Sequence, residues 1–111
     1  MDFLESARDL GIETAEFLEL TELFLNTSYC DLDNLSTAID QEDFQAAVKA
    51  AHSIKGAAGN LGFNNIYEKA KTAEVEASQG LLEKNGLVIS SIRDMLDCIG
   101  DYIKEQGNFG D

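Results

Sequence analysis

The sequence lacks proline and tryptophan, and it has few basic residues and a single histidine. Its 111 residues include two cysteines, one histidine and eight Lys or Arg against 21 Asp or Glu. Because proline interrupts helices, its absence favours long helices joined by short connections. The formal net charge of −13 argues against nucleic acid and against an anionic membrane as partners, since both would repel this chain.

Other features that the sequence lacks exclude further classes of protein. No apolar run approaches the roughly 18–20 residues that span a bilayer, and the acidic segment MDFLESARDLG does not resemble a signal peptide. Cys30 and Cys98 form no CxxC pair, and one histidine offers no metal constellation. We therefore expect a cytoplasmic protein with two reduced thiols and no metal of its own. A single disulfide is the open alternative.

Apolar residues recur at three- and four-residue spacing in four segments, which is typical of amphipathic helices. The predicted helices cover residues 14–40, 42–61, 63–79 and 82–106, and a short helical segment is predicted within residues 2–8. Gly62 is a natural stop for the second helix. Since short connections make neighbouring helices antiparallel, we predict an all-α fold. It is an antiparallel up-and-down four-helix bundle with a short N-terminal helix, in one domain over residues 1–111.

The only histidine lies in the stretch AAHSIKGAAGNLGF, residues 50–63. On a helical wheel the apolar residues of the segment form one arc, and His52 lies roughly 130° from its centre. Gly56 and Gly59 fall on the side of His52, although each interior glycine costs a helix about 1 kcal/mol relative to alanine. Close helix packing is one reason for such glycines. Their position away from the core favours another, that a ligand approaches the imidazole closely.

The charge pattern supports an anionic ligand at this histidine. Residues 45–72 carry a net charge of +3, which leaves −16 for the rest of the chain. The basic residues of this window are Lys49, Lys55, Lys69 and Lys71. A solvated lysine face is the simpler explanation, but together with His52 and the glycines the window suits a phosphoryl group.

The segment AHSIKGAAGNLGF resembles the signature of histidine-containing phosphotransfer (HPt) domains. That signature is His-x-x-Lys-Gly followed by a glycine ten residues after the histidine, and His52, Lys55, Gly56 and Gly62 match it. The resemblance covers residues 13–105, including KAKTAEVEASQG, where Glu74 stands at a position that many members fill with glutamate or glutamine.

This resemblance implies a phosphorelay intermediate. His52 would accept a phosphoryl group from a receiver-domain aspartate or a kinase and pass it to a response-regulator aspartate. Lys55 would stabilise the phosphoryl group, with Lys49 and Lys71 as supporting charges, and Gly56 would provide clearance. The resemblance leaves the role of Glu74 open, and geometry alone adds Gly59 to the clearance.

The same resemblance bears on partners and cofactors. The expected partners are receiver domains of response regulators and a hybrid or chemotaxis-type histidine kinase. Mg²⁺ would be held by the receiver, so the chain itself binds no cofactor. Because no glycine-rich ATP motif is present, no autonomous kinase activity is expected. Nothing in the sequence demands more than a monomer.

The sequence leaves alternatives open for the function. A non-phosphorylated helical interaction module would use the same bundle, and the chain fits either a free-standing protein or a domain excised from a sensor kinase.

Apolar residues occupy more than one face of the first long helix, and we predict that some form a docking patch near His52. Burial under the N-terminal segment is the alternative. These residues are Phe17, Leu18, Leu20, Leu23, Phe24 and Leu25.

Overall fold

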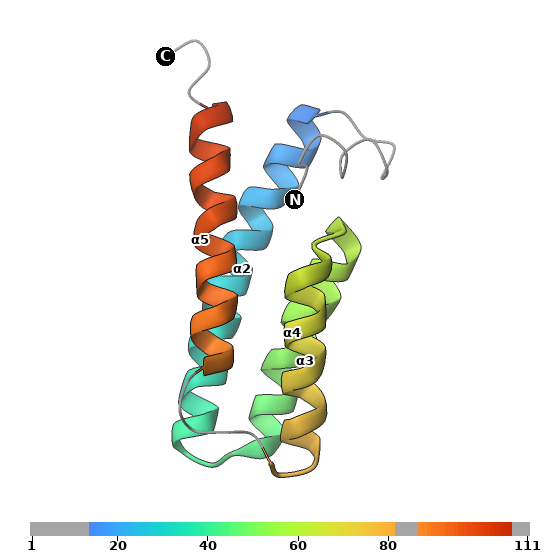
Figure 1. Cartoon of the computed structure of the whole chain (residues 1–111), viewed down its shortest axis with the longest axis vertical. Helices are drawn as coiled ribbons and strands as arrows, with labels where there is room; N and C mark the ends of the chain where they lie inside the picture. The colour runs from blue at the N-terminus through green and yellow to red at the C-terminus, as the bar shows by residue number, and fades with distance from the viewer. Residues whose placement is uncertain (1–13, 82–86, 108–111) are drawn as a thin grey trace.

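The computed structural model describes residues 14–81 and 87–107, which form four α-helices without any strand (Figure 1). Helix α2 spans Thr14–Asp40, α3 spans Phe44–Leu61, α4 spans Asn64–Ser78 and α5 spans Leu87–Gly107. The predicted all-α bundle is therefore confirmed. The predicted helix within residues 2–8 and the predicted start of the last helix at residue 82 lie outside the described residues. The single-domain extent of 1–111 stays a prediction.

The four helices run alternately up and down along the long axis of the molecule (Figure 1). Helix α3 packs against α2 and α4, while α5 packs against α2 and α4, so each helix contacts the two beside it in the ring. The molecule measures 47 × 26 × 17 Å, and α2 and α5 project beyond α3 and α4 at one end (Figure 1). Helix α3 is thus flanked by two helices and exposes the face opposite the core.

Local signals in the sequence set the ends of α3. The Asp43 side chain accepts a hydrogen bond from the backbone N–H of Ala46 at 3.1 Å, which satisfies a donor of the first turn. Capping by Asp43, next to Glu42 with φ of 54°, makes α3 begin at Phe44, two residues later than predicted. At the other end Gly62 adopts φ of 80°, a left-handed conformation that glycine tolerates, so the helix ends where predicted.

One continuous apolar core joins the four helices. Phe63, in the connection between α3 and α4, packs its ring against Phe17 and Phe24 of α2, with ring centroids 6.1 and 5.1 Å apart. Alanine makes up much of the buried surface of α3 and α4, so these two helices contribute small side chains to the core. The buried alanines are Ala47, Ala50, Ala51 and Ala58 on α3 and Ala70, Ala73 and Ala77 on α4.

The apolar residues of α2 divide between the core and the surface. Phe17, Phe24 and Leu25 are buried and Leu18 is half-buried. Leu20 and Leu23 are 44% and 63% exposed, so these two residues are the ones available to a docking patch.

Two further predictions concern the thiols and the membrane. Cys30 and Cys98 are exposed and free, so the structure contains no disulfide between them. In the described part of the chain, no helix is both long and apolar enough to cross a bilayer.

Candidate phosphotransfer site

Helix α3 presents His52 to solvent, as the helical wheel predicts. The His52 side chain is 66% exposed. Its neighbours Ala51 and Ile54 are completely buried on the opposite face. The apolar face of α3 thus fixes the helix on the core and holds the imidazole outward, where a large partner can reach it.

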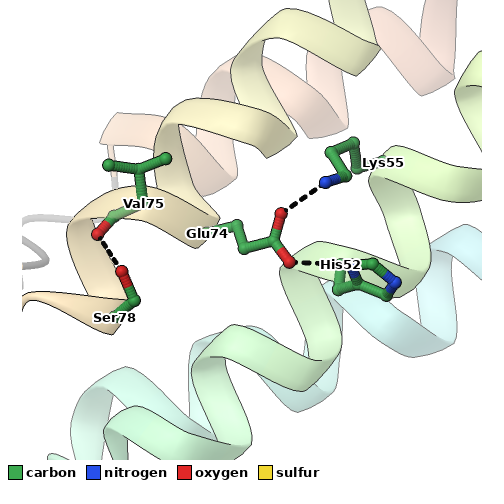
Figure 2. A network of polar contacts seen from close by, with 5 residues as sticks. All are labelled: His52, Lys55, Glu74, Val75 and Ser78. Carbon is green, nitrogen blue, oxygen red and sulfur yellow. Dashed lines mark hydrogen bonds and ion pairs between the residues drawn. The ribbon is translucent and has the colours of Figure 1, made fainter.

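Glu74 of α4 connects the two key residues of α3 (Figure 2). Its Oε2 lies 2.7 Å from His52 Nδ1, and its Oε1 lies 2.7 Å from Lys55 Nζ. One carboxylate therefore holds both the imidazole and the ammonium group, using a different oxygen for each. The sequence left the role of Glu74 open, and the structure places it in direct contact with His52.

The charge on Glu74 decides which nitrogen of His52 carries hydrogen. The Lys55 hydrogen bond is the main cause that lowers the pKa of Glu74; burial opposes it, and the His52 hydrogen bond adds to the lowering. The carboxylate is therefore ionised at neutral pH and can only accept hydrogen bonds. It follows that His52 Nδ1 donates to Glu74, and that Nε2 of the neutral ring keeps its lone pair. In Figure 2 this second nitrogen points away from Glu74.

Lys55 is held in its charged form beside the imidazole. The hydrogen bond to Glu74 is the main cause that raises the pKa of the Lys55 ammonium, and burial opposes it. Only 23% of the Lys55 side chain is exposed, a small fraction for a surface lysine. The fixed ammonium group, one helical turn from His52, can donate hydrogen bonds to the oxygens of a dianionic group.

The two interior glycines of α3 have different surroundings. A Cβ at Gly56 would meet nothing within 4 Å, so packing within the described chain gives no reason for glycine at this position. A Cβ at Gly59 would lie 3.2 Å from Tyr67 Cδ2 of α4. Close packing of α4 is therefore a second reason for a small residue at position 59, and the role of Gly59 in opening room for a ligand stays a prediction. A wheel of α3 alone placed both glycines on one face and did not include the ring of α4.

Lys49 and Lys71 flank the site from opposite sides. Lys49 is exposed on α3, one turn before His52, and lines a groove between α2 and α3 with a volume of about 500 Å³. Lys71 is exposed on α4, one turn before Glu74. Both charges are close enough in sequence and helix register to support an anion near His52, and their roles stay predictions.

The groove beside Lys49 contains residues that sequence reasoning missed. Ser53, the residue after His52, donates a hydrogen bond to Asp31 Oδ2 of α2 at 2.6 Å. Both residues line the groove, together with Asn34 and Thr37. No sequence signal links Ser53 to Asp31, because their contact depends on how α2 and α3 align.

Metal binding requires several coordinating side chains close together. Among residues 14–81 and 87–107, no group of three or more His, Cys, Asp or Glu side chains is arranged to hold one. The Glu74 carboxylate, which contacts His52, already binds the imidazole and Lys55.

Comparison with known families agrees with this geometry. The model of the Hpt domain family matches residues 19–101, which include all four signature residues and Glu74. The chain belongs to the Hpt domain family. Hpt domains are phosphotransfer modules of two-component signalling, and the exposed His52 of this Hpt domain lies within the matched region.

A curated relative supports the same family. The chain is 30% identical over 95 residues to the chemotaxis protein CheA of Salmonella typhimurium. The match covers 83% of this chain and 14% of CheA, so this Hpt domain corresponds to a small part of that protein. No solved structure matches the chain.

Proposed function

We propose that this Hpt domain accepts a phosphoryl group on Nε2 of His52 and passes it to an aspartate of a response regulator. The observation that carries the proposal is the contact of His52 Nδ1 with Glu74, which leaves Nε2 as the nucleophilic nitrogen of an exposed ring. Receiver domains and a hybrid or chemotaxis-type histidine kinase are the proposed partners, and the cytoplasm is the proposed compartment.

The proposed step needs no proton transfer to or from the nucleophile. The lone pair of Nε2 forms a bond to phosphorus while the bond from phosphorus to the donor oxygen breaks. The electron pair leaves with the aspartate carboxylate of a receiver donor, or with ADP where a kinase supplies ATP. The ring becomes positively charged because its hydrogen stays on Nδ1. The Glu74 carboxylate, 2.7 Å from Nδ1, offsets this charge. The reverse sequence delivers the group to the next aspartate.

Lys55 has a separate proposed role in this step. In the unphosphorylated site its ammonium group binds Glu74 Oε1 at 2.7 Å. The phosphoryl oxygens would carry more negative charge than this one carboxylate oxygen, so Lys55 can turn toward them as the group arrives. Positioning and charge neutralisation are the main contributions that phosphoryl transfer requires of a protein.

Docking is proposed on the face shared by α2 and α3. Leu20 and Leu23 are exposed on α2, about two to three turns before Asp31, which contacts Ser53 beside His52. Gly56 adds bare backbone next to the imidazole. A small apolar patch of this kind fits the limited interface of a transient signalling pair.

The test is phosphotransfer to the purified chain from phosphorylated receivers and from a chemotaxis-type kinase supplied with ATP, comparing wild type with His52→Gln. We expect an acid-labile label on the wild type alone, and the arm that labels it identifies the class of donor. Equal labelling of His52→Gln would exclude His52 as the acceptor. Failure of every donor to label the wild type would favour the non-phosphorylated interaction module.

A further inference from the structure

The ring of Tyr67 lies directly on the backbone of α3. An ideal Cβ on Gly59 would be 3.2 Å from Tyr67 Cδ2 and 3.5 Å from Cε2, closer than side chains normally approach. Tyr67 is half-buried and packs against the apolar core, so its ring is held from two sides. A side chain at position 59 would therefore displace the ring from this place by a few tenths of an ångström.

The Tyr67 ring contacts α3 one helical turn after Lys55. Lys55 precedes Gly59 by one helical turn, and Tyr67 precedes Glu74 by two turns on the same face of α4. Since α3 and α4 are antiparallel, the contacts of Gly59 with Tyr67 and of Lys55 with Glu74 fix the register of this face. Lys55 thus reaches Glu74 on the face of α4 that also bears Tyr67, two turns earlier.

Two properties of Lys55 agree with a neighbouring ring. Its side chain is only 23% exposed, which means that its long apolar stem is covered. Its pKa is raised mainly by the hydrogen bond to Glu74, with a smaller contribution from Tyr67. Two residues of α4, Glu74 and Tyr67, therefore act on the charge of this lysine.

We propose that Tyr67 is a positioning residue for Lys55, and that Gly59 is present to seat the Tyr67 ring. The proposal rests on the function proposed above, because Lys55 matters only if His52 carries a phosphoryl group. A free lysine samples many rotamers and loses that freedom when it binds. A ring that covers the stem restricts these rotamers beforehand and keeps the ammonium group near His52.

The two glycines of α3 then serve different purposes. Gly56 leaves space open to the outside of the protein, whereas Gly59 leaves space for a ring of the protein itself. The contact is made by ring carbons, so the ring rather than the hydroxyl group should be required.

The first test is a double-mutant cycle on the rate of transfer to His52, with Tyr67→Leu, Tyr67→Phe, Lys55→Ala and the pair Lys55→Ala/Tyr67→Leu. We expect Tyr67→Leu to slow transfer about fivefold, as for a weakened charge-assisted contact, and Tyr67→Phe to restore the wild-type rate. In the Lys55→Ala background, Tyr67→Leu should have no further effect. Equal rates for Tyr67→Leu and wild type, or additive losses in the pair, would overturn the proposal.

The second test follows the Lys55 ammonium group by ¹⁵N NMR and needs no phosphodonor. Tyr67→Leu should move the Lys55 signal toward that of a solvent-exposed lysine, while Tyr67→Phe should leave it unchanged. Tyr102→Leu, the same change at a half-buried tyrosine of α5, controls for general loosening. An unchanged Lys55 signal in Tyr67→Leu contradicts the positioning role. A shifted signal in a protein that no donor labels would instead contradict the proposed function alone.

Discussion

Replacing Gly56 with leucine should stabilise the fold and block transfer from a receiver domain. A Cβ at this position meets nothing within 4 Å and Gly56 is exposed, so we expect the larger side chain to extend into solvent. The helix then gains about 0.8 kcal/mol from the better propensity of leucine. For a domain of this size that gain raises Tm by roughly 3–6 °C. Enhanced stability together with lost activity is the signature of a glycine kept for function.

The loss of transfer follows from the position of the new side chain. Leucine at position 56 is one turn from His52 on the exposed face, where the receiver must bring its phosphorylated aspartate to Nε2. A misplacement of about 1 Å in such a step costs about 100-fold in rate, and we expect a loss of this size. Phosphoramidate is a small donor that needs no docking surface, so it should label Gly56→Leu at close to the wild-type rate.

The assay combines a thermal melt followed by circular dichroism with labelling from both donors. Ser90→Leu adds the same side chain at an exposed position of α5 and should transfer like wild type. If Gly56→Leu takes the phosphoryl group from a receiver as fast as wild type, clearance is the wrong explanation for Gly56. If Gly56→Leu has a lower melting temperature than wild type, the inference of open space at this position is wrong.

Three further predictions concern the carboxylate at the site, the core and the α2–α5 contact. Glu74→Gln should slow labelling of His52 about two- to fivefold, since exchanging a charged for a neutral acceptor at an exposed contact costs about 0.5–1 kcal/mol. Glu76→Gln removes the same charge two residues away and should not slow labelling. If it slows labelling as much as Glu74→Gln does, the effect comes from net charge and not from the contact with His52. Ser28→Ala should raise the free energy of unfolding by about 1 kcal/mol in urea titrations, because the buried Ser28 Oγ has no hydrogen-bond partner among the described residues. A loss of stability would mean that this oxygen has a partner. Burial, and then the hydrogen bond to Asp97, raise the pKa of Tyr29 to about 12. The folded state therefore holds this phenol neutral, and the stability it contributes is complete below about pH 10 and falls as pH rises toward 12. Absorbance at 295 nm should show one late-titrating tyrosine that Tyr29→Phe removes.

Helical periodicity was sufficient to predict the bundle and the exposure of His52. The apolar residues of α3 repeat regularly, and Ala51, Ile54 and Ala58 are all completely buried. The end of this helix was equally readable, because Gly62 adopts the left-handed conformation that a glycine stop implies. Such features depend only on residues within a few turns of one another.

The contacts between helices could not be predicted from the periodicity of the sequence. The hydrogen bond of Glu74 to His52 joins residues 22 positions apart, and it exists only because α3 and α4 pack in one particular register. The packing of Gly59 against Tyr67 has the same origin. A wheel describes one helix at a time, so it could not distinguish Gly59 from Gly56.

The central claim is that phosphorylation takes place on Nε2 of His52 while Glu74 holds Nδ1. The direct measurement is NMR of the phosphorylated chain with ¹⁵N-labelled histidine, in which coupling to ³¹P identifies the bonded nitrogen. Since His52 is the only histidine in the sequence, a single coupled nitrogen should appear. We predict coupling at Nε2, with the hydrogen retained on Nδ1. Coupling at Nδ1, or a phosphorylated protein in which neither ring nitrogen is coupled, would contradict the account.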